Sequence, residues 1–398
     1  MRFALFYHTV RSDWNHGHSH FLRGMVRALA ALGHQAICYE EAGGWSVTNL
    51  VAEYGLGPLV QFRRRFPDIE TRLYRCEPHA ELERRLAREL SGVDVVIAHE
   101  WPAIENPGLM DALARLKRTC GFKLLLHDNH HRILTQPVRL ARTHLERFDA
   151  VLAYGPSMAA EYRRRFGLRE VHVLHEAADT SLFRPLAADP ERPEDDALFI
   201  GNWGGRDRAH EMREFLLRPA KHFRKEGRRF AIYGVRYPPQ VLRTIRDYYG
   251  VDYRGWLPNY RVPEAFAQAR VGIHVVRRQY ARVLYGIPTI RVFEALACGV
   301  PLVSTRWQDT DHLFREGQDY LVVDTRAQME EALAWLWEDE TARRRLARSG
   351  LARIRAEHTY LHRAEQLLGI IARIVVPRDT RAGREPAARV EAREALRA

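Results

Sequence analysis

The chain has 398 residues, carries 62 Lys or Arg against 50 Asp or Glu, and has a formal net charge of +12. Its apolar fraction of 46% is typical of a folded chain, and at roughly 100–200 residues per domain the length predicts two globular domains. These values exclude a disulfide-stapled miniprotein, and no apolar run approaches the ~20 residues that span a bilayer.

Four well-separated cysteines without a CxxC pair predict reduced thiols in a cytoplasmic protein and no zinc site. All but four of the 62 basic residues are arginine, which we interpret as coding bias and solvated helix faces. Arginines and acids intermingle, so nucleic acid is not an expected partner. The charge alone leaves open a peripheral contact with an anionic membrane, or an anionic polymer whose binding falls steeply with salt.

Short apolar runs alternate with stretches of helical period along the first half of the chain. The predicted strands are Phe3 to Tyr7, Gln35 to Tyr39, Thr71 to Arg75, Asp94 to His99, Lys123 to His127, Ala150 to Ala153 and Glu170 to Leu174. The helical patterns are His20 to Leu32, Leu82 to Leu90, Leu109 to Arg118, Val138 to Phe148 and Ser157 to Phe166. This order predicts a parallel sheet covered on both faces.

Residues 185–196, rich in proline and acid, predict a linker. Beyond it the predicted strands are Ala197 to Ile200, Phe230 to Tyr233, Val251 to Tyr253, Val271 to Val275, Pro301 to Ser304 and Tyr320 to Val323. The helical patterns are Met212 to Phe223, Val241 to Tyr249, Arg291 to Ala297, Gln328 to Glu338, Thr341 to Glu357 and Leu361 to Val375. We therefore expect an α/β fold of two Rossmann-like domains, 1–184 and 197–376, facing across a cleft and followed by a charged tail, 377–398, that is disordered or helical.

Ligands of such sheets bind beyond the carboxyl ends of the strands. The loop after the first predicted strand contains Gly17 and His18 and enters a helix, which is the form of an anion site. One of the histidines that crowd this loop, His16, His18 or His20, is a candidate general base, because imidazole titrates near neutral pH. Glu100 and Asp128 follow two further strands and could orient that base. The alternatives are a polar entry loop and helix capping by Asp128.

Two segments of the second half contain further candidate ligand-binding residues. The motif GNWGGRDR, which includes Gly201, Asn202, Arg206 and Arg208, forms a phosphate-sized nest or a plain tight turn. In RVFEALACGVPLVST, Glu294 lies among apolar neighbours and needs a partner. Two vicinal sugar hydroxyls would satisfy that carboxylate, and pairing with Arg291 on a solvated helix face is the equal alternative.

The segment RVFEALACGVPLVST resembles the nucleotide-sugar signature of GT-B glycosyltransferases of group 1, nearest to the CgeB-like, spore-maturation-type branch. SDWNHGHSHFLRGMVRALAALGH, LFIGNWGGRDR, YRGWLPNYRVPEAFAQARVGIHVVR and FREGQDYLVV are similar to other segments of that branch, in the same order. The resemblance implies an acceptor-binding first domain and a second domain that binds a nucleotide-diphosphate sugar.

The resemblance implies a role for each matching residue. Glu294 would bind the ribose of the donor, and Arg291 and the loop from Gly201 to Arg208 would lie near its diphosphate. Trp256 and Leu257 would lie at the edge of its base. Arg278 and Tyr285 are further donor-contact candidates, and Gly17 and His18 correspond to the loop that meets the reacting sugar. Retaining relatives carry a second Glu eight residues before the ribose-binding one, whereas position 286 here is Gly.

The expected activity is transfer of a sugar from a nucleotide-diphosphate sugar, a UDP-sugar above others, to an acceptor hydroxyl, with no metal and no other cofactor. The acceptor class is open among saccharides, lipid-linked molecules, proteins and small molecules. The alternatives are a nucleotide-sugar epimerase or hydrolase of the same fold and a non-catalytic sugar-nucleotide-binding protein.

Overall fold

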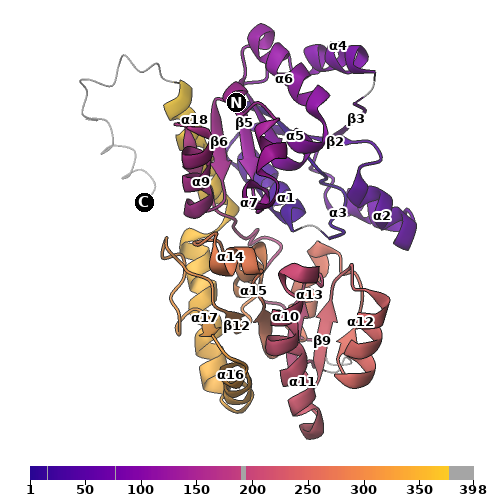
Figure 1. The fold of residues 1–398 in the computed structure, drawn as a ribbon, viewed down its shortest axis with the longest axis vertical. Coiled ribbons are helices and arrows are strands. Elements are labelled where there is room, and N and C mark those ends of the chain that lie inside the picture. The colour runs from indigo at the N-terminus through magenta and orange to yellow at the C-terminus, as the bar shows by residue number, and fades with distance from the viewer. Residues whose placement is uncertain (16, 77, 190–193, 376–398) are drawn as a thin grey trace, which may run out of the picture.

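The computed structural model describes residues 1–15, 17–76, 78–189 and 194–375. The predicted tail, 377–398, and part of the predicted linker lie outside them. The described chain forms two parallel sheets, one above the other in Figure 1, each covered by helices. The expected α/β architecture of two Rossmann-like halves is confirmed.

The first sheet has seven parallel strands in the order β3-β2-β1-β4-β5-β6-β7. Their bounds are β1 Arg2–Tyr7, β2 Gln35–Glu41, β3 Thr71–Tyr74, β4 Val95–His99, β5 Lys123–Asp128, β6 Ala150–Ala153 and β7 Val171–Val173. The helices of this half are α1 His18–Ala31, α2 Trp45–Tyr54, α3 Gly57–Arg65, α4 His79–Glu89, α5 Glu100–Glu105, α6 Pro107–Cys120, α7 Arg132–Thr135, α8 Pro137–Ala141 and α9 Pro156–Phe166.

The second sheet has six parallel strands in the order β10-β9-β8-β11-β12-β13. Their bounds are β8 Ala197–Ile200, β9 Phe230–Tyr233, β10 Asp252–Tyr253, β11 Gly272–His274, β12 Leu302–Thr305 and β13 Leu321–Val323. The helices of this half are α10 Ala209–Met212, α11 Arg218–Phe223, α12 Pro239–Arg243, α13 Val262–Ala267, α14 Arg278–Arg282, α15 Ile290–Ala297, α16 Arg326–Glu338, α17 Glu340–Glu357 and α18 Tyr360–Val375.

Apolar side chains on both faces of each sheet explain the near-continuous apolar runs in the strands. On the first sheet, α4, α6 and α9 cover one face, and α1 and α18 cover the other. On the second sheet, α11 and α16 cover one face while α13 and α15 cover the other. In both halves, the loops at the carboxyl ends of the strands meet between the sheets.

The structure contains helices that the sequence did not predict, α2 and α3 among them, and two predicted helices differ in their packing or length. The predicted second domain, 197–376, includes α18, but this helix crosses back and packs on α1 of the first half (Figure 1). Gly24 of α1 permits the contact, because a Cβ there would lie 2.0 Å from the ring of Tyr360. The helix predicted from Val138 to Phe148 ends at Ala141, and His144 has a φ of 55°.

Candidate active site

Two cavities lie between the facing edges of the two sheets. One, called the donor-side cavity because Gly201, Asn202 and Arg291 were predicted to contact the donor, has a volume of about 190 Å³. It is lined mostly by loops of the second sheet, together with Asp13, Asn15 and Gly17 of the first half. The other, called the acceptor-side cavity because it holds the predicted catalytic residue His18, has a volume of about 520 Å³. Its lining includes His18 after β1, Glu100 after β4 and Glu176 after β7, together with residues of the second half. Gly17, Asn202 and Arg277 line both cavities, so the two spaces meet at these residues.

Arginines gather at the wall of the donor-side cavity. Arg208 is buried, and its guanidinium donates to the carbonyl of Val275 at 3.2 Å and to Oδ1 of Asn202 at 3.1 Å. Its Nε has no hydrogen-bond partner among the described residues. Burial, followed by the nearby charges of Arg277 and Arg291, lowers the pKa of Arg208 to about 9. Arg277 and Arg291 also line this cavity, and a wall with three guanidiniums favours an anion.

Glycines allow the backbone to approach this anion site closely. A Cβ on Gly234 would lie 2.0 Å from the carbonyl oxygen of Gly201, so the loops after β8 and β9 can meet only without that side chain. A Cβ on Gly17 would lie 2.6 Å from Ile290. Gly17, Gly201 and Asn202, all predicted to lie at the donor site, line this cavity.

The structure brings Arg208 and Arg291 to the donor-side cavity, but it does not bring every predicted donor contact there. Arg206 is exposed and lines neither cavity, and Arg278 lies 3.4 Å from Glu211 as an exposed ion pair. The Tyr285 hydroxyl donates to the carbonyl of Arg282. Sequence reasoning missed Arg277, which donates to Oδ1 of Asn202 at 3.0 Å.

Glu294 lies under the donor-side cavity and not in its lining. The carboxylate is fully buried, accepts from Nδ2 of Asn259 at 2.7 Å and pairs with Arg291. The pairing with Arg291 predicted as the alternative therefore occurs, but on a buried face. Burial opposes ionisation of Glu294, yet Arg291 and His20 outweigh it and lower its pKa below the usual range. In the structure this carboxylate holds two cavity-lining side chains, Arg291 and Asn259.

His20 is a second partner of Glu294 that sequence reasoning did not assign. Its Nδ1 lies 2.8 Å from Oε1 of Glu294, and its Nε2 accepts from the backbone N–H of Asp179 at 3.1 Å. Because Nε2 is an acceptor, the ring proton is on Nδ1 and is donated to the carboxylate. The contact joins α1 to α15 across the two halves.

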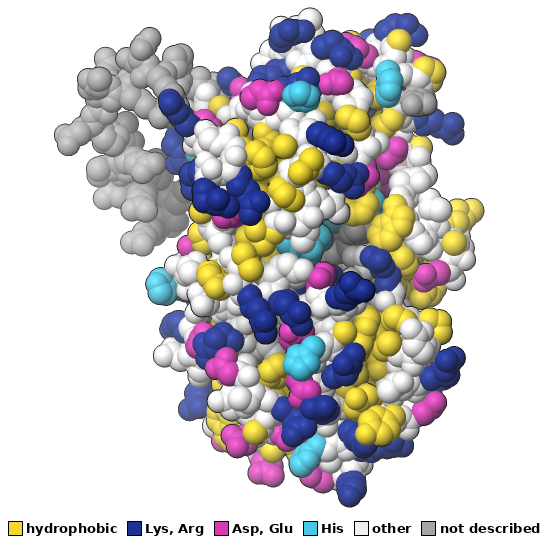
Figure 2. Space-filling view, in the orientation of Figure 1, with side chains coloured by type: hydrophobic (Ala, Val, Ile, Leu, Met, Phe, Trp, Pro, Cys, Tyr) yellow, Lys and Arg dark blue, Asp and Glu magenta, His cyan; other side chains and the backbone are white. Residues whose placement is uncertain are grey.

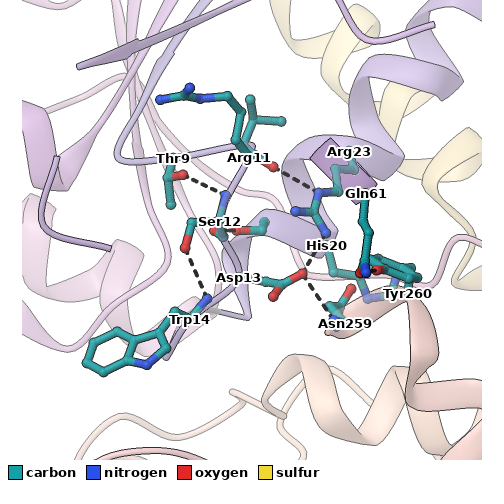
Figure 3. Close-up of polar contacts among 12 residues, drawn as sticks. Thr9, Arg11, Ser12, Asp13, Trp14, His20, Arg23, Gln61, Asn259 and Tyr260 are labelled. Atoms are coloured by element: carbon teal, nitrogen blue, oxygen red, sulfur yellow. Dashed lines mark hydrogen bonds and ion pairs between the residues drawn. The ribbon is translucent and has the colours of Figure 1, made fainter. Parts of the chain in front are cut away.

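Asp13 joins the halves beside the donor-side cavity (Figure 3). Its carboxylate, 5% exposed, accepts from the Arg23 guanidinium at 2.9 Å, the Trp256 indole N–H at 3.1 Å and the Asn259 backbone N–H at 3.0 Å. The predicted base-edge residues, Trp256 and Leu257, line the cavity. The turn that holds them is therefore fastened to the first half of the chain.

His18 begins α1 and lines the acceptor-side cavity. Its ring centroid lies 5.1 Å from that of His99 and 5.8 Å from that of His8. Burial is the main cause that lowers the pKa of both neighbours to about 3, so His8 and His99 are neutral at neutral pH. His18 thus faces the cavity beside uncharged imidazoles.

The two carboxylates predicted to orient His18 have other partners. Glu100 is buried and pairs with Arg132. Asp128 is also buried, accepts from the Tyr162 hydroxyl at 2.6 Å and from the His130 backbone N–H at 2.9 Å, and does not line the cavity. Burial raises the pKa of Glu100 to about 7 and that of Asp128 to about 8. The bond to His130 closes a turn before α7, but the N-terminus of α7 at His131 has no side-chain cap, so Asp128 does not cap that helix as the alternative predicted.

A third carboxyl, Glu176, was not singled out from the sequence. It follows β7, lines the acceptor-side cavity and accepts from Nδ2 of Asn129 at 3.1 Å. The Asn129 side chain in turn accepts from Nε2 of His99 at 2.9 Å. Burial raises the pKa of Glu176 to about 8. Its position directly after a strand of the parallel sheet is the signal that could have identified it.

Within the described parts of the chain, no group of three His, Cys, Asp or Glu side chains is arranged to hold a metal ion. None of the helices described is both long and apolar enough to cross a membrane.

Comparisons with known proteins agree with this geometry. Residues 16–182 match the model of Glycosyltransferase Family 4, and residues 208–369 match a model described as Glycosyl transferase-like. None of the curated proteins compared matches the chain in sequence.

Solved structures show the same fold. HepE of Anabaena, in complex with UDP and glucose, has a TM-score of 0.64 at 13% identity, with 94% of this chain and 100% of that chain covered. Sucrose-phosphate synthase from Thermosynechococcus elongatus has a TM-score of 0.64 at 16% identity over 94% and 99%. An α-glucosyltransferase in complex with UDP has a TM-score of 0.66 at 13% identity over 94% and 100%. The chain therefore has the GT-B fold of these structures, and each of its halves matches a glycosyltransferase model.

Proposed function

We propose that the protein transfers a sugar from a UDP-sugar to an acceptor hydroxyl in the cleft, without a metal ion. The observation that carries the proposal is the buried guanidinium of Arg208 beside Arg277 and Arg291 at the donor-side cavity. These cations would stabilise the charge that develops on the leaving diphosphate. The UDP and UDP-glucose complexes of HepE support this choice of donor.

In the proposed reaction, the acceptor oxygen forms a bond to the anomeric carbon while the bond from that carbon to the diphosphate breaks. The acceptor hydroxyl proton goes to His18, which lines the acceptor-side cavity next to the junction of the two cavities. Arg291 and Asn259, held by Glu294, would contact the nucleotide, and Trp256 and Leu257 would edge its base. The order of GNWGGRDR and RVFEALACGVPLVST supports membership of the CgeB-like branch.

The first test compares two arginines of one loop. Arg208→Ala should weaken UDP binding at least tenfold in calorimetry, because the buried cation at the cavity is lost. Arg206→Ala is the matched control, because Arg206 is exposed and lines neither cavity. Melting curves without ligand show whether each variant is folded. Equal affinity of folded Arg208→Ala and the parent would contradict the placement of the diphosphate.

Assays of the protein with a UDP-sugar distinguish sugar transfer from the alternative functions. Products formed without an added acceptor identify an epimerase or hydrolase, and donor binding with no turnover identifies a non-catalytic protein. Turnover that persists in EDTA supports reaction without a metal ion, and loss of turnover that Mg²⁺ restores contradicts it.

A further inference from the structure

Exposed apolar side chains gather where α2 meets α3, outside the linings of both cavities. Residues 52–57, from the last turn of α2 to the first residue of α3, are all exposed. Within this segment Leu56 is 66% exposed, and one turn into α3 Val60 is 50% exposed. Figure 2 shows hydrophobic side chains at the right-hand edge of the molecule, where Figure 1 places α2. Aliphatic side chains this exposed, close together on one helical connection, indicate a contact surface.

The same helix ends in three exposed arginines, Arg63, Arg64 and Arg65. No ion pair within the described residues involves any of them, and α3 contains no acidic residue. The chain has two other triple-arginine runs, 163–165 and 343–345. There Arg164 and Arg165 pair with Glu161, and Arg344 pairs with Glu340. The α3 run therefore differs from the paired arginines on the other helices.

The helical period places the apolar and basic groups together. Arg63 and Arg64 follow Val60 at i+3 and i+4, so these three residues share one face of α3. Phe62 is buried on the opposite side of the helix, in the core of the first half. The exposed face thus combines aliphatic side chains with unpaired guanidiniums, which is the composition of a helix that lies in the headgroup region of an anionic membrane.

We propose that the α3 face, defined as Leu56, Val60, Arg63 and Arg64 with the adjacent exposed Arg65, docks on an anionic phospholipid surface. The two aliphatic side chains enter the interface, and the guanidiniums bind headgroup phosphates. A membrane fits the face better than a nucleic acid, because a nucleic acid backbone offers no apolar environment for Leu56 and Val60. α2 begins at Trp45, which lines the acceptor-side cavity, so docking would hold the mouth of that cavity near the lipid surface.

The experiment is cosedimentation of the full chain with phosphatidylcholine vesicles, with and without phosphatidylglycerol. The parent should bind only the anionic vesicles. The triple variant Arg63→Glu, Arg64→Glu, Arg65→Glu should bind them roughly a hundredfold more weakly. The matched control, Arg344→Glu, Arg345→Glu, Arg348→Glu, changes the net charge equally on exposed α17 positions and should bind like the parent. Equal loss in both triple variants, or no vesicle binding by the parent, would overturn the proposal.

A second variant separates lipid from nucleic acid. Leu56→Ser with Val60→Ser should weaken vesicle binding but leave binding of a duplex DNA oligonucleotide unchanged. If the α3 arginines govern DNA binding while the serine variant binds vesicles like the parent, the face is a nucleic-acid site and the proposal is wrong. Melting curves show that each variant is folded, and calorimetry with UDP keeps this test independent of the proposed reaction.

Discussion

At the scale of single residues, His18 and its neighbours decide the proposed proton transfer. Burial lowers the pKa of His8 and His99 to about 3, which makes both imidazoles weak bases, whereas His18 lines the acceptor-side cavity beside Gly17, where the two cavities meet. We expect His18→Ala to lower turnover by about 10²- to 10⁴-fold, the usual contribution of a general base. UDP release from the UDP-sugar that binds most tightly measures this, and UDP affinity should stay at the parent value. His144→Ala, on the exposed surface, is the control; turnover of His18→Ala at the control level would remove the assignment.

The raised pKa of Glu176 should make the free energy of unfolding depend on pH. Burial raises the pKa of its carboxyl to about 8, so the folded state holds a proton that the unfolded state loses at lower pH. This contribution to stability is present at acidic pH and is lost as pH rises toward 8. Glu176→Gln keeps a neutral side chain, so it should be more stable than the parent by roughly 1–3 kcal/mol at pH 8–9 and should differ little at pH 5. Melting temperatures across this range provide the measurement, and a parallel pH dependence of both proteins would refute the burial argument.

At the scale of elements, the strands were largely predictable because each buried parallel strand is a short apolar run bounded by turn residues. The donor loops after β8 and before α15 were predictable for the same reason, since their glycines and prolines mark the turns. Pairings across the halves were not. His20 and Glu294 are 274 residues apart, and Arg277 differs from its neighbour Arg278 only in the direction of its side chain. Local sequence carries neither kind of information.

The packing of α18 on α1 is another contact that local sequence does not predict, and a substitution at Gly24 tests it. Gly24→Ala would place a Cβ against the buried Tyr360 ring, so α18 must shift or the ring must rotate. We expect a loss of about 1–3 kcal/mol in the free energy of unfolding, the usual cost of overpacking. Gly369→Ala on α18 itself is the matched control, because a Cβ there meets nothing within 4 Å. It should stabilise the helix slightly. Urea denaturation compares the two, and an equal effect would show that α18 does not depend on this contact.

At the scale of the whole molecule, Asp13 links the donor site to the relative position of the two halves. One carboxylate of the first half accepts from the Trp256 indole and the Asn259 backbone of the second, and from Arg23 of its own half. Removing it leaves three donors without this partner, and an unsatisfied buried donor costs about 1–3 kcal/mol. We therefore expect Asp13→Ala to weaken UDP binding about tenfold and to populate a more open molecule.

Small-angle scattering and calorimetry with UDP together test this coupling. The parent should have the same radius of gyration with and without UDP if the Asp13 contacts hold it closed, whereas Asp13→Ala should be larger without UDP and contract on binding, because UDP then selects the closed state. Asp68→Ala is the control, since Asp68 is an exposed carboxylate that pairs with Arg27 within the first half. An Asp13→Ala protein with the parent's size and weakened UDP affinity would show that Asp13 acts on the nucleotide site alone. Unchanged size and unchanged affinity would show that the remaining contacts between the halves, such as His20 with Glu294, suffice to close the molecule.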